Sequence, residues 1–170
     1  MLSAINIPKW VEENRHLLKP PVGNKQVYVG NKDFIVMIVG GPNARRDFHI
    51  NLTEELFYQI EGSITIKVIE NGFIEDIHLS AGDMFLLPGG TPHSPRRTAR
   101  SIGLVIEKPR NENDLDGFRW YCENCESFLY EAQINVSDIV IQLPIVMNAF
   151  YADPSLCTCK NCGHLNEKPL

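Results

Sequence analysis

A succession of short apolar runs, each closed by a turn residue, is the feature that most restricts the fold of this sequence. Between Gln26 and Glu107 the runs are rich in Val, Ile, Phe and Leu, and Gly, Pro and Asn interrupt them at hairpin spacing. No long helical pattern separates the runs, so we predict a mainly β fold, an antiparallel barrel or jelly roll. The expected strands are residues 26–28, 34–39, 47–50, 56–61, 63–69, 74–79, 84–87, 93–96 and 101–107.

The start of the chain carries a helical pattern instead. Asn6 is a typical N-cap residue, Pro8 lies in the first turn, and apolar residues recur at helical spacing as far as Leu18. The segment Lys19-Pro20-Pro21 ends the pattern. We predict a short amphipathic helix that packs against the sheet.

The chain beyond Pro109 has a different organisation. Residues 110–114 are polar and predict a surface linker, residues 118–121 predict a strand, and residues 139–151 predict a helical segment interrupted by Pro144. This part holds too little apolar surface for an independent core, so a bound metal would help to hold it. We therefore divide the chain into a barrel with its helix, residues 1–113, and a C-terminal extension, residues 114–170.

The charge and the apolar runs limit the classes of partner. A formal net charge of -5 over 170 residues disfavours a general nucleic-acid binder, because phosphate contacts need clustered Lys and Arg. The chain starts without a basic segment followed by an apolar run, and its apolar runs are shorter than a bilayer requires. We expect neither a signal peptide nor a membrane span.

Two histidines and a carboxylate form the first set of potential metal ligands. In a barrel, alternate residues of a strand face inward, so His49, Glu55 and His93 can meet in the lumen although they come from different strands. Two His and one carboxylate leave open positions on a metal, the arrangement that suits non-haem Fe(II) enzymes that use oxygen. A closed structural site would need four protein ligands. These three residues therefore predict a catalytic metal site.

All five cysteines lie in the C-terminal extension. Cys122 with Cys125, and Cys159 with Cys162, form two C-x-x-C pairs, which together predict a four-thiolate site for iron or zinc. A site closed by four ligands is expected to be structural and remote from catalysis. Disulfides are the alternative, but no export signal accompanies the cysteines, so we favour a reduced, cytoplasmic protein. Cys157 is expected to be a free thiol or a neighbour of the site.

Two motifs resemble those of the cupin superfamily. Gly82, Pro88, Gly90 and His93 stand at the spacing of the second cupin motif, and Glu55 followed by Gly62 matches the end of the first. Asn51 stands where many cupins have a second His of the first motif, and Arg97 where many have an Asn. The resemblance implies a cupin-type barrel whose metal ligands are reduced to His49, Glu55 and His93.

A closer resemblance extends over most of the chain. The blocks that carry it are residues 17–24, 39–43, 57–59, 86–88, 92–95, 105–107 and 120–122, and they occur in the order found in the 3-hydroxyanthranilate 3,4-dioxygenase family. The two cysteine pairs resemble the short microbial form of that family. That form implies a homodimer with a rubredoxin-like iron in the extension.

The resemblance also implies an activity and the roles of several residues. The activity is Fe(II)-dependent opening of the ring of 3-hydroxyanthranilate by O2 to 2-amino-3-carboxymuconate semialdehyde, the precursor of quinolinate in tryptophan degradation and NAD biosynthesis. Arg45 would hold the substrate carboxylate, Arg97 the oxygen side, and Glu107 would accept a proton or hydrogen bond. Arg46, Arg96 and Arg100 are expected to be solvated charges. The implied substrate-binding residues are Arg45, Glu55, Arg97, Glu107, Val22, Asn24, Met37 and Pro95.

Two other functions compete with this interpretation. One is a metal-dependent cupin that acts on a different aminophenol. The other is a non-catalytic cupin sensor of aromatic acids, whose extension contacts another macromolecule. Oxygen consumption with 3-hydroxyanthranilate would favour the first interpretation, and binding of aromatic acids without turnover would favour the sensor.

Overall fold

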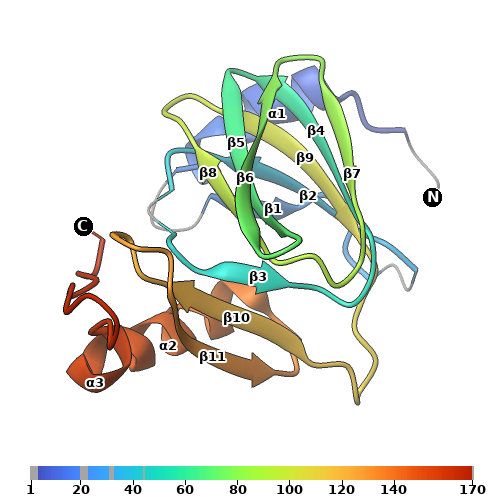
Figure 1. Ribbon diagram of the computed structural model, residues 1–170. Helices are drawn as coiled ribbons and strands as arrows, with labels where there is room; N and C mark the ends of the chain where they lie inside the picture. The colour runs from blue at the N-terminus through green and yellow to red at the C-terminus, as the bar shows by residue number, and fades with distance from the viewer. Residues whose placement is uncertain (1–3, 20–22, 31–32, 44, 170) are drawn as a thin grey trace.

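The computed structural model describes residues 4–19, 23–30, 33–43 and 45–169 and consists of two antiparallel sheets packed face to face (Figure 1). One sheet has five strands in the order β1-β2-β9-β4-β7, and the other has six in the order β11-β10-β3-β8-β5-β6. This arrangement confirms the predicted mainly β fold. The strands are β1 (Asn24–Gln26), β2 (Ile35–Gly40), β3 (Phe48–Ile50), β4 (Glu55–Glu61), β5 (Ser63–Glu70), β6 (Phe73–Ser80), β7 (Met84–Leu87), β8 (His93–Arg97), β9 (Ile102–Glu107), β10 (Asp116–Tyr121) and β11 (Phe128–Ile134).

Alternation of inward and outward side chains builds the core between the sheets. Along β5, the side chains of Ile64, Ile66 and Val68 are buried while their neighbours are more exposed. They pack in one cluster with Phe57 of β4 and Val105 of β9 from the opposite sheet. The nine predicted strands all occur, with their ends shifted by up to two residues, because the apolar runs that predicted them supply the buried faces and the turn residues between the runs end the strands.

The helix predicted at the start of the chain is present as α1 (Ile7–Asn14), followed by a 3-10 turn, η1 (Arg15–Leu17). Its cap is Asn6, whose side chain accepts a hydrogen bond from the backbone N–H of Lys9 at 3.0 Å. Val11 packs in a buried cluster with Ile38 of β2 and Ile102 of β9. The helix therefore covers part of the five-stranded sheet.

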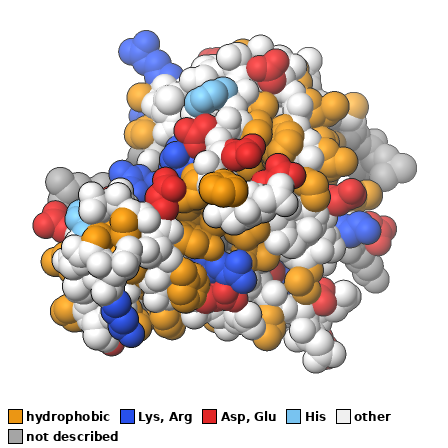
Figure 2. Space-filling model, viewed as in Figure 1, with side chains coloured by type: hydrophobic (Ala, Val, Ile, Leu, Met, Phe, Trp, Pro, Cys, Tyr) orange, Lys and Arg blue, Asp and Glu red, His pale blue; other side chains and the backbone are white. Residues whose placement is uncertain are grey.

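The remaining outer surface of that sheet is apolar where β4 and β7 pair. Tyr58 lies opposite Met84, and Leu56 lies opposite Leu86. Met84 and Leu86 are 67% and 53% exposed. Figure 2 shows hydrophobic side chains gathered over this edge of the barrel, where β7 lies. We name these four residues the β4–β7 patch.

The C-terminal part continues the six-stranded sheet. Strand β10 pairs with β3, so that Phe118 lies opposite His49, and β11 pairs with β10. The proposed division at residue 113 stays a prediction, but it falls within a chain segment that leads from β9 of one sheet to β10 of the other. Helices α2 (Ile139–Ala152) and α3 (Pro154–Cys157) follow, and they lie beside β10 and β11 (Figure 1).

The expectation that this part lacks a core is wrong. Phe118, Trp120 and Phe150 are fully buried in one apolar cluster, and the rings of Trp120 and Phe150 stack with centroids 4.5 Å apart. Pro144 lies inside α2 and does not interrupt it. The contacts of the cluster stabilise the helix despite the hydrogen bond that proline removes. Strand β11 and helix α3 were not predicted.

Among the described residues, no helix combines the length and the apolar character that crossing a bilayer requires.

Candidate active site

Three strands bring the predicted metal ligands together inside the barrel. His49 of β3 and His93 of β8 lie directly opposite each other in one sheet, and Glu55 begins β4 in the other sheet. All three are buried, and one ligand atom from each lies within 4.8 Å of the others. The jelly roll therefore places the two imidazoles and the carboxylate around one point, as the sequence predicted for a metal site.

The hydrogen bonds of these residues fit a cation at that point. His93 Nδ1 lies 3.1 Å from the carbonyl oxygen of Thr91, which can only accept, so Nδ1 carries the proton and Nε2 carries the lone pair. Nε2 lies 3.2 Å from Glu55 Oε2, yet this buried oxygen accepts no hydrogen bond from any described residue. Burial raises the pKa of Glu55, but His93, His49 and Arg110 together more than offset this, and the pKa lies below its usual range. A carboxylate oxygen without a donor, beside an imidazole nitrogen that carries a lone pair, could bind a cation.

A cavity of about 920 Å³ opens onto the three ligands. Its lining includes Arg45, Arg97 and Glu107, and also Asn24, Met37 and Pro95, all of which the sequence analysis assigned to the pocket. Val22 lies outside the described residues. Leu143 and Met147 of α2, and Lys168 near the end of the chain, line the same cavity. The C-terminal part thus forms one wall of the pocket, which the sequence analysis did not predict.

Arg97 presents a buried positive charge to the pocket. It is only 5% exposed, and within the part of the chain that the structure describes its Nη1 has no hydrogen-bond partner. Burial lowers the pKa of Arg97 to about 10, against a smaller opposing effect of the charge of Glu55. A Cβ added to Gly103 would come within 2.7 Å of Nη1, so this glycine makes room for the guanidinium. A buried donor without a partner indicates a ligand-binding role.

Arg45, unlike Arg97, is paired with a carboxylate. Its Nε and Nη2 donate to the two carboxylate oxygens of Asp47 at 3.1 and 2.6 Å, and Asp47 is fully buried. The guanidinium plane is therefore fixed at the edge of the cavity. The expectation of a solvated Arg96 is wrong, because Arg96 is half-buried and donates to the carbonyl oxygens of Arg45 and Arg46. Arg96 thus supports the segment that carries Arg45.

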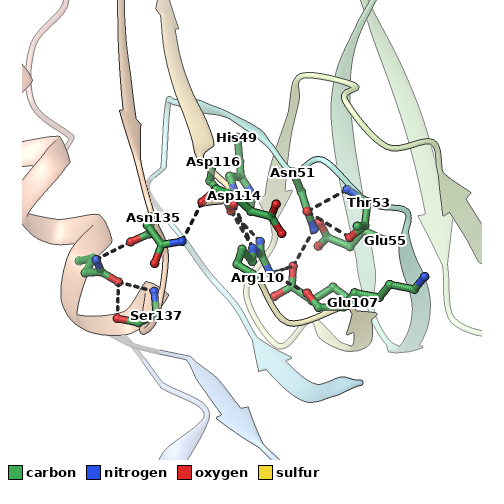
Figure 3. Close-up of polar contacts among 12 residues, drawn as sticks. His49, Asn51, Thr53, Glu55, Glu107, Arg110, Asp114, Asp116, Asn135 and Ser137 are labelled. Carbon is green, nitrogen blue, oxygen red and sulfur yellow. Dashed lines mark hydrogen bonds and ion pairs between the residues drawn. The ribbon is translucent and has the colours of Figure 1, made fainter. Parts of the chain in front are cut away.

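Glu107 is buried beside the ligands, as expected for an inward-facing residue at the end of β9. Burial, together with the nearby charge of Glu55, raises the pKa of Glu107 to about 7. Its Oε2 accepts a hydrogen bond from Asn51 Nδ2 at 3.0 Å and forms an ion pair with Arg110 Nη1 at 2.9 Å (Figure 3). Asn51, which stands where many cupins have a metal-binding His, therefore donates a hydrogen bond to Glu107.

The sequence analysis did not predict three charged residues of the site. Asp47 and Asp116 are fully buried carboxylates, and Arg110, placed in the predicted surface linker, has a side chain only 5% exposed. That linker assignment is wrong for Arg110, which binds Asp116 and Glu107. Its neighbours Asn111, Glu112 and Asn113 are exposed, so the local pattern contained no signal that separated Arg110 from a surface residue.

The four predicted cysteines form a second cluster. The sulfur atoms of Cys122 and Cys162 are 3.5 Å apart, and those of Cys125 and Cys159 are 3.6 Å apart. A tetrahedron with metal–sulfur bonds of about 2.3 Å has sulfur atoms about 3.8 Å apart, so a metal fits. The hydrogen bond of Cys125 with Ser127 lowers the pKa of this thiol to about 5, which favours the thiolate. Cys157 is outside the cluster and packs in the apolar core.

Comparison with known proteins identifies close relatives over nearly the whole chain. A family model described as 3-hydroxyanthranilic acid dioxygenase matches residues 1–151. A 3-hydroxyanthranilate 3,4-dioxygenase of Neurospora crassa is 50% identical over 97% of this chain and 91% of its own length. One of Xanthomonas euvesicatoria is 48% identical over 99% of this chain and 95% of its own length.

Solved structures support the fold. A cupin-2 domain protein from Shewanella frigidimarina superposes with a TM-score of 0.50 over 62% of this chain and 94% of its own. The identity is 22%, so the likeness concerns the barrel alone.

Proposed function

The chain belongs to the 3-hydroxyanthranilic acid dioxygenase family, and on that basis we propose that it opens the ring of 3-hydroxyanthranilate with O2. The product is 2-amino-3-carboxymuconate semialdehyde, the precursor of quinolinate in tryptophan degradation and NAD biosynthesis. The observation that carries the proposal is the buried set of His49, Glu55 and His93, which faces a cavity containing the unpaired guanidinium of Arg97.

The metal held by these three residues is proposed to be Fe(II). Two histidines and one carboxylate are the ligand set of non-haem Fe(II) oxygenases. When bound, such an ion orients both reactants and draws developing charge toward itself. The protein contributes the burial of the three ligands and the hydrogen bond from His93 Nδ1 to Thr91, which turns Nε2 toward the site.

Two arginines are proposed to recognise the reactants. Arg45 binds the substrate carboxylate, and its pairing with Asp47 supports this role because a guanidinium plane fixed in advance loses little freedom when it binds. Arg97 acts on the oxygen side, where the nearby charge of Glu55 indicates that it lies close to the metal ligands. Asn24, Met37, Pro95 and Val22 complete the proposed substrate-binding set.

Glu107 is proposed to accept a proton or a hydrogen bond from the hydroxyl or amino group of the substrate. A pKa near 7 suits a group that must take up a proton at neutral pH. Asn51 and Arg110 hold the carboxylate in place. The acceptor is thus oriented before the substrate arrives.

The proposal is tested by loading the protein with Fe(II) under anaerobic conditions and adding 3-hydroxyanthranilate and then O2. Oxygen uptake and the absorbance of the muconate semialdehyde are expected to rise together. No oxygen uptake by folded, iron-loaded protein would overturn the proposal. Binding of aromatic acids without turnover would favour a sensor.

We also propose that the protein is a cytoplasmic homodimer and that the β4–β7 patch contributes to the dimer contact. An antiparallel sheet that faces water normally presents polar side chains, whereas this patch presents Tyr58, Met84, Leu56 and Leu86. Exposed apolar patches of this kind mark protein interfaces.

The four-cysteine cluster is proposed to hold iron or zinc in a structural role. Cys125→Ser is expected to remove that metal and to lower the midpoint of thermal unfolding by about 5–10 °C, because metal binding contributes folding free energy. Oxygen uptake per iron-loaded molecule is expected to stay within about twofold, since no cysteine lines the described cavity.

Cys157→Ala is the matched control, because it removes a thiol outside the cluster and should retain the metal. Metal analysis, calorimetry and the oxygen assay check both variants. Abolished turnover in folded, iron-loaded Cys125→Ser protein would contradict a structural role.

A further inference from the structure

The ring of His49 is held at both its face and its edge. Its face stacks on Phe118, with centroids 5.0 Å apart and planes inclined by 18°. Its edge contacts Asp116, with Nε2 2.6 Å from Oδ2 (Figure 3). Stacking fixes the plane of an imidazole but does not determine which of its two nitrogens carries the proton. The contact with Asp116 is therefore the one that decides which nitrogen is protonated and which keeps its lone pair.

Asp116 is itself held by Arg110. Arg110 Nε donates to Oδ1 at 3.0 Å, and Nη2 donates to Oδ2 at 2.6 Å. Asp116 is fully buried, and a carboxylate bound by two N–H groups of a guanidinium accepts hydrogen bonds only. His49 Nε2 must then be the donor, which leaves the lone pair of a neutral ring on Nδ1.

We propose that Asp116, held by Arg110, is the positioning residue that fixes the tautomer of His49 and so presents Nδ1 to the metal. Carboxylates that accept the second N–H of a metal-binding histidine are common supports of such sites. His93 is oriented the opposite way, because its Nδ1 donates to Thr91 and its Nε2 faces Glu55. The two histidines therefore bind the metal through different nitrogens. This inference rests on the metal site of the proposed function.

Arg110 also connects Asp116 with Glu107. Its Nη1 lies 2.9 Å from Glu107 Oε2, so one guanidinium contacts both Asp116 and Glu107. Figure 3 shows Arg110 between Asp116 and Glu107, with His49 next to Asp116. Neutralising Asp116 should therefore disturb both the ligand His49 and the acceptor Glu107.

The direct test is the state of the ring nitrogens in protein labelled with 15N-histidine and loaded with Zn(II) as a diamagnetic probe. Long-range 1H–15N correlation spectra should show a protonated Nε2 and a metal-bound Nδ1 for His49, and the reverse for His93. A spectrum of His93→Ala assigns the two rings. Binding of Zn(II) by His49 Nε2 would overturn the inference, whereas failure of both rings to bind Zn(II) would overturn the metal site and with it the proposed function.

The second measurement uses Asp116→Asn, which keeps the size of the side chain but turns one oxygen into a donor. The variant is expected to lower Zn(II) affinity at the histidine site about 10–100-fold and to give a mixture of His49 tautomers. The exposed Glu112→Gln is the matched control and should change neither quantity. Unchanged affinity and an unchanged His49 tautomer in folded Asp116→Asn protein would contradict the positioning role. If Asp116→Asn does not fold, the wild-type spectrum alone decides.

Discussion

Glu55→Ala is expected to remove the metal from the histidine site and to lower turnover to less than about one-thousandth of the wild-type value. Glu55 is the only carboxylate of the three-ligand group and the only one of the three from the five-stranded sheet. A metal contributes several kcal/mol to stabilising a transition state, and each 1.4 kcal/mol corresponds to about tenfold in rate. His49→Ala is expected to have the same effect.

The measurements are iron content, oxygen uptake and circular dichroism. The barrel should stay folded, because its apolar cluster around Phe57, Ile66 and Val105 does not include the ligands. The neighbouring Glu54→Ala is the matched control, since Glu54 is exposed and lies outside the described ligand group. A melted barrel in Glu55→Ala would show a structural site, and full activity would exclude the proposed ligand set.

Arg97→Met is expected to lower kcat/KM by about 100–1,000-fold while raising the stability of the protein. Loss of one preorganised donor from an active site has an effect of this size on the rate. The buried guanidinium has no partner for Nη1, and burial lowers its pKa to about 10, so the folded state carries the charge at a cost. Methionine fills similar space without that charge, and we expect a gain of about 1–3 kcal/mol in the free energy of unfolding.

Steady-state kinetics at varied O2 and varied 3-hydroxyanthranilate distinguish the proposed roles of Arg45 and Arg97. Arg97→Met should act mainly on kcat and the KM for O2, whereas Arg45→Ala should raise mainly the KM for the aromatic substrate. Arg97→Lys should not restore activity, because an ammonium lacks the planar donor pair. The exposed Arg100→Ala should behave like wild type. The reverse pattern of KM changes would exchange the proposed roles of Arg45 and Arg97.

The sequence predicted the features that depend on local pattern. Strands such as β5 and β7 were located closely because a short apolar run and the turn-forming glycine before it determine where each strand begins and how long it is. The two groups of candidate metal ligands were also predicted, because thiolates at C-x-x-C spacing and His–Glu–His on separate strands are ligand patterns in themselves. The His–Glu–His group therefore indicated the position of the candidate active site before the structure was known.

Helix α2 shows why the C-terminal part was harder. It is apolar on most of its surface, so its sequence does not indicate which side is buried, and Pro144 suggested a break. Stacking of Phe150 on Trp120 stabilises the helix, and this contact joins residues far apart in the chain. Only the folded chain therefore showed that Leu143 and Met147 form a wall of the pocket.

By itself, the sequence predicted the barrel, its two groups of candidate metal ligands and, through family resemblance, the charged residues Arg45, Arg97 and Glu107 that line the cavity. Only the tertiary structure showed which residues form hydrogen bonds and ion pairs with these side chains. The contact of His49 with Asp116 joins residues 67 positions apart, and it exists because β10 pairs with β3 in a register that places Phe118 opposite His49. Register between distant strands depends on the whole core, so no local pattern distinguishes Asp116 or Arg110 from the acidic and basic residues of a surface loop.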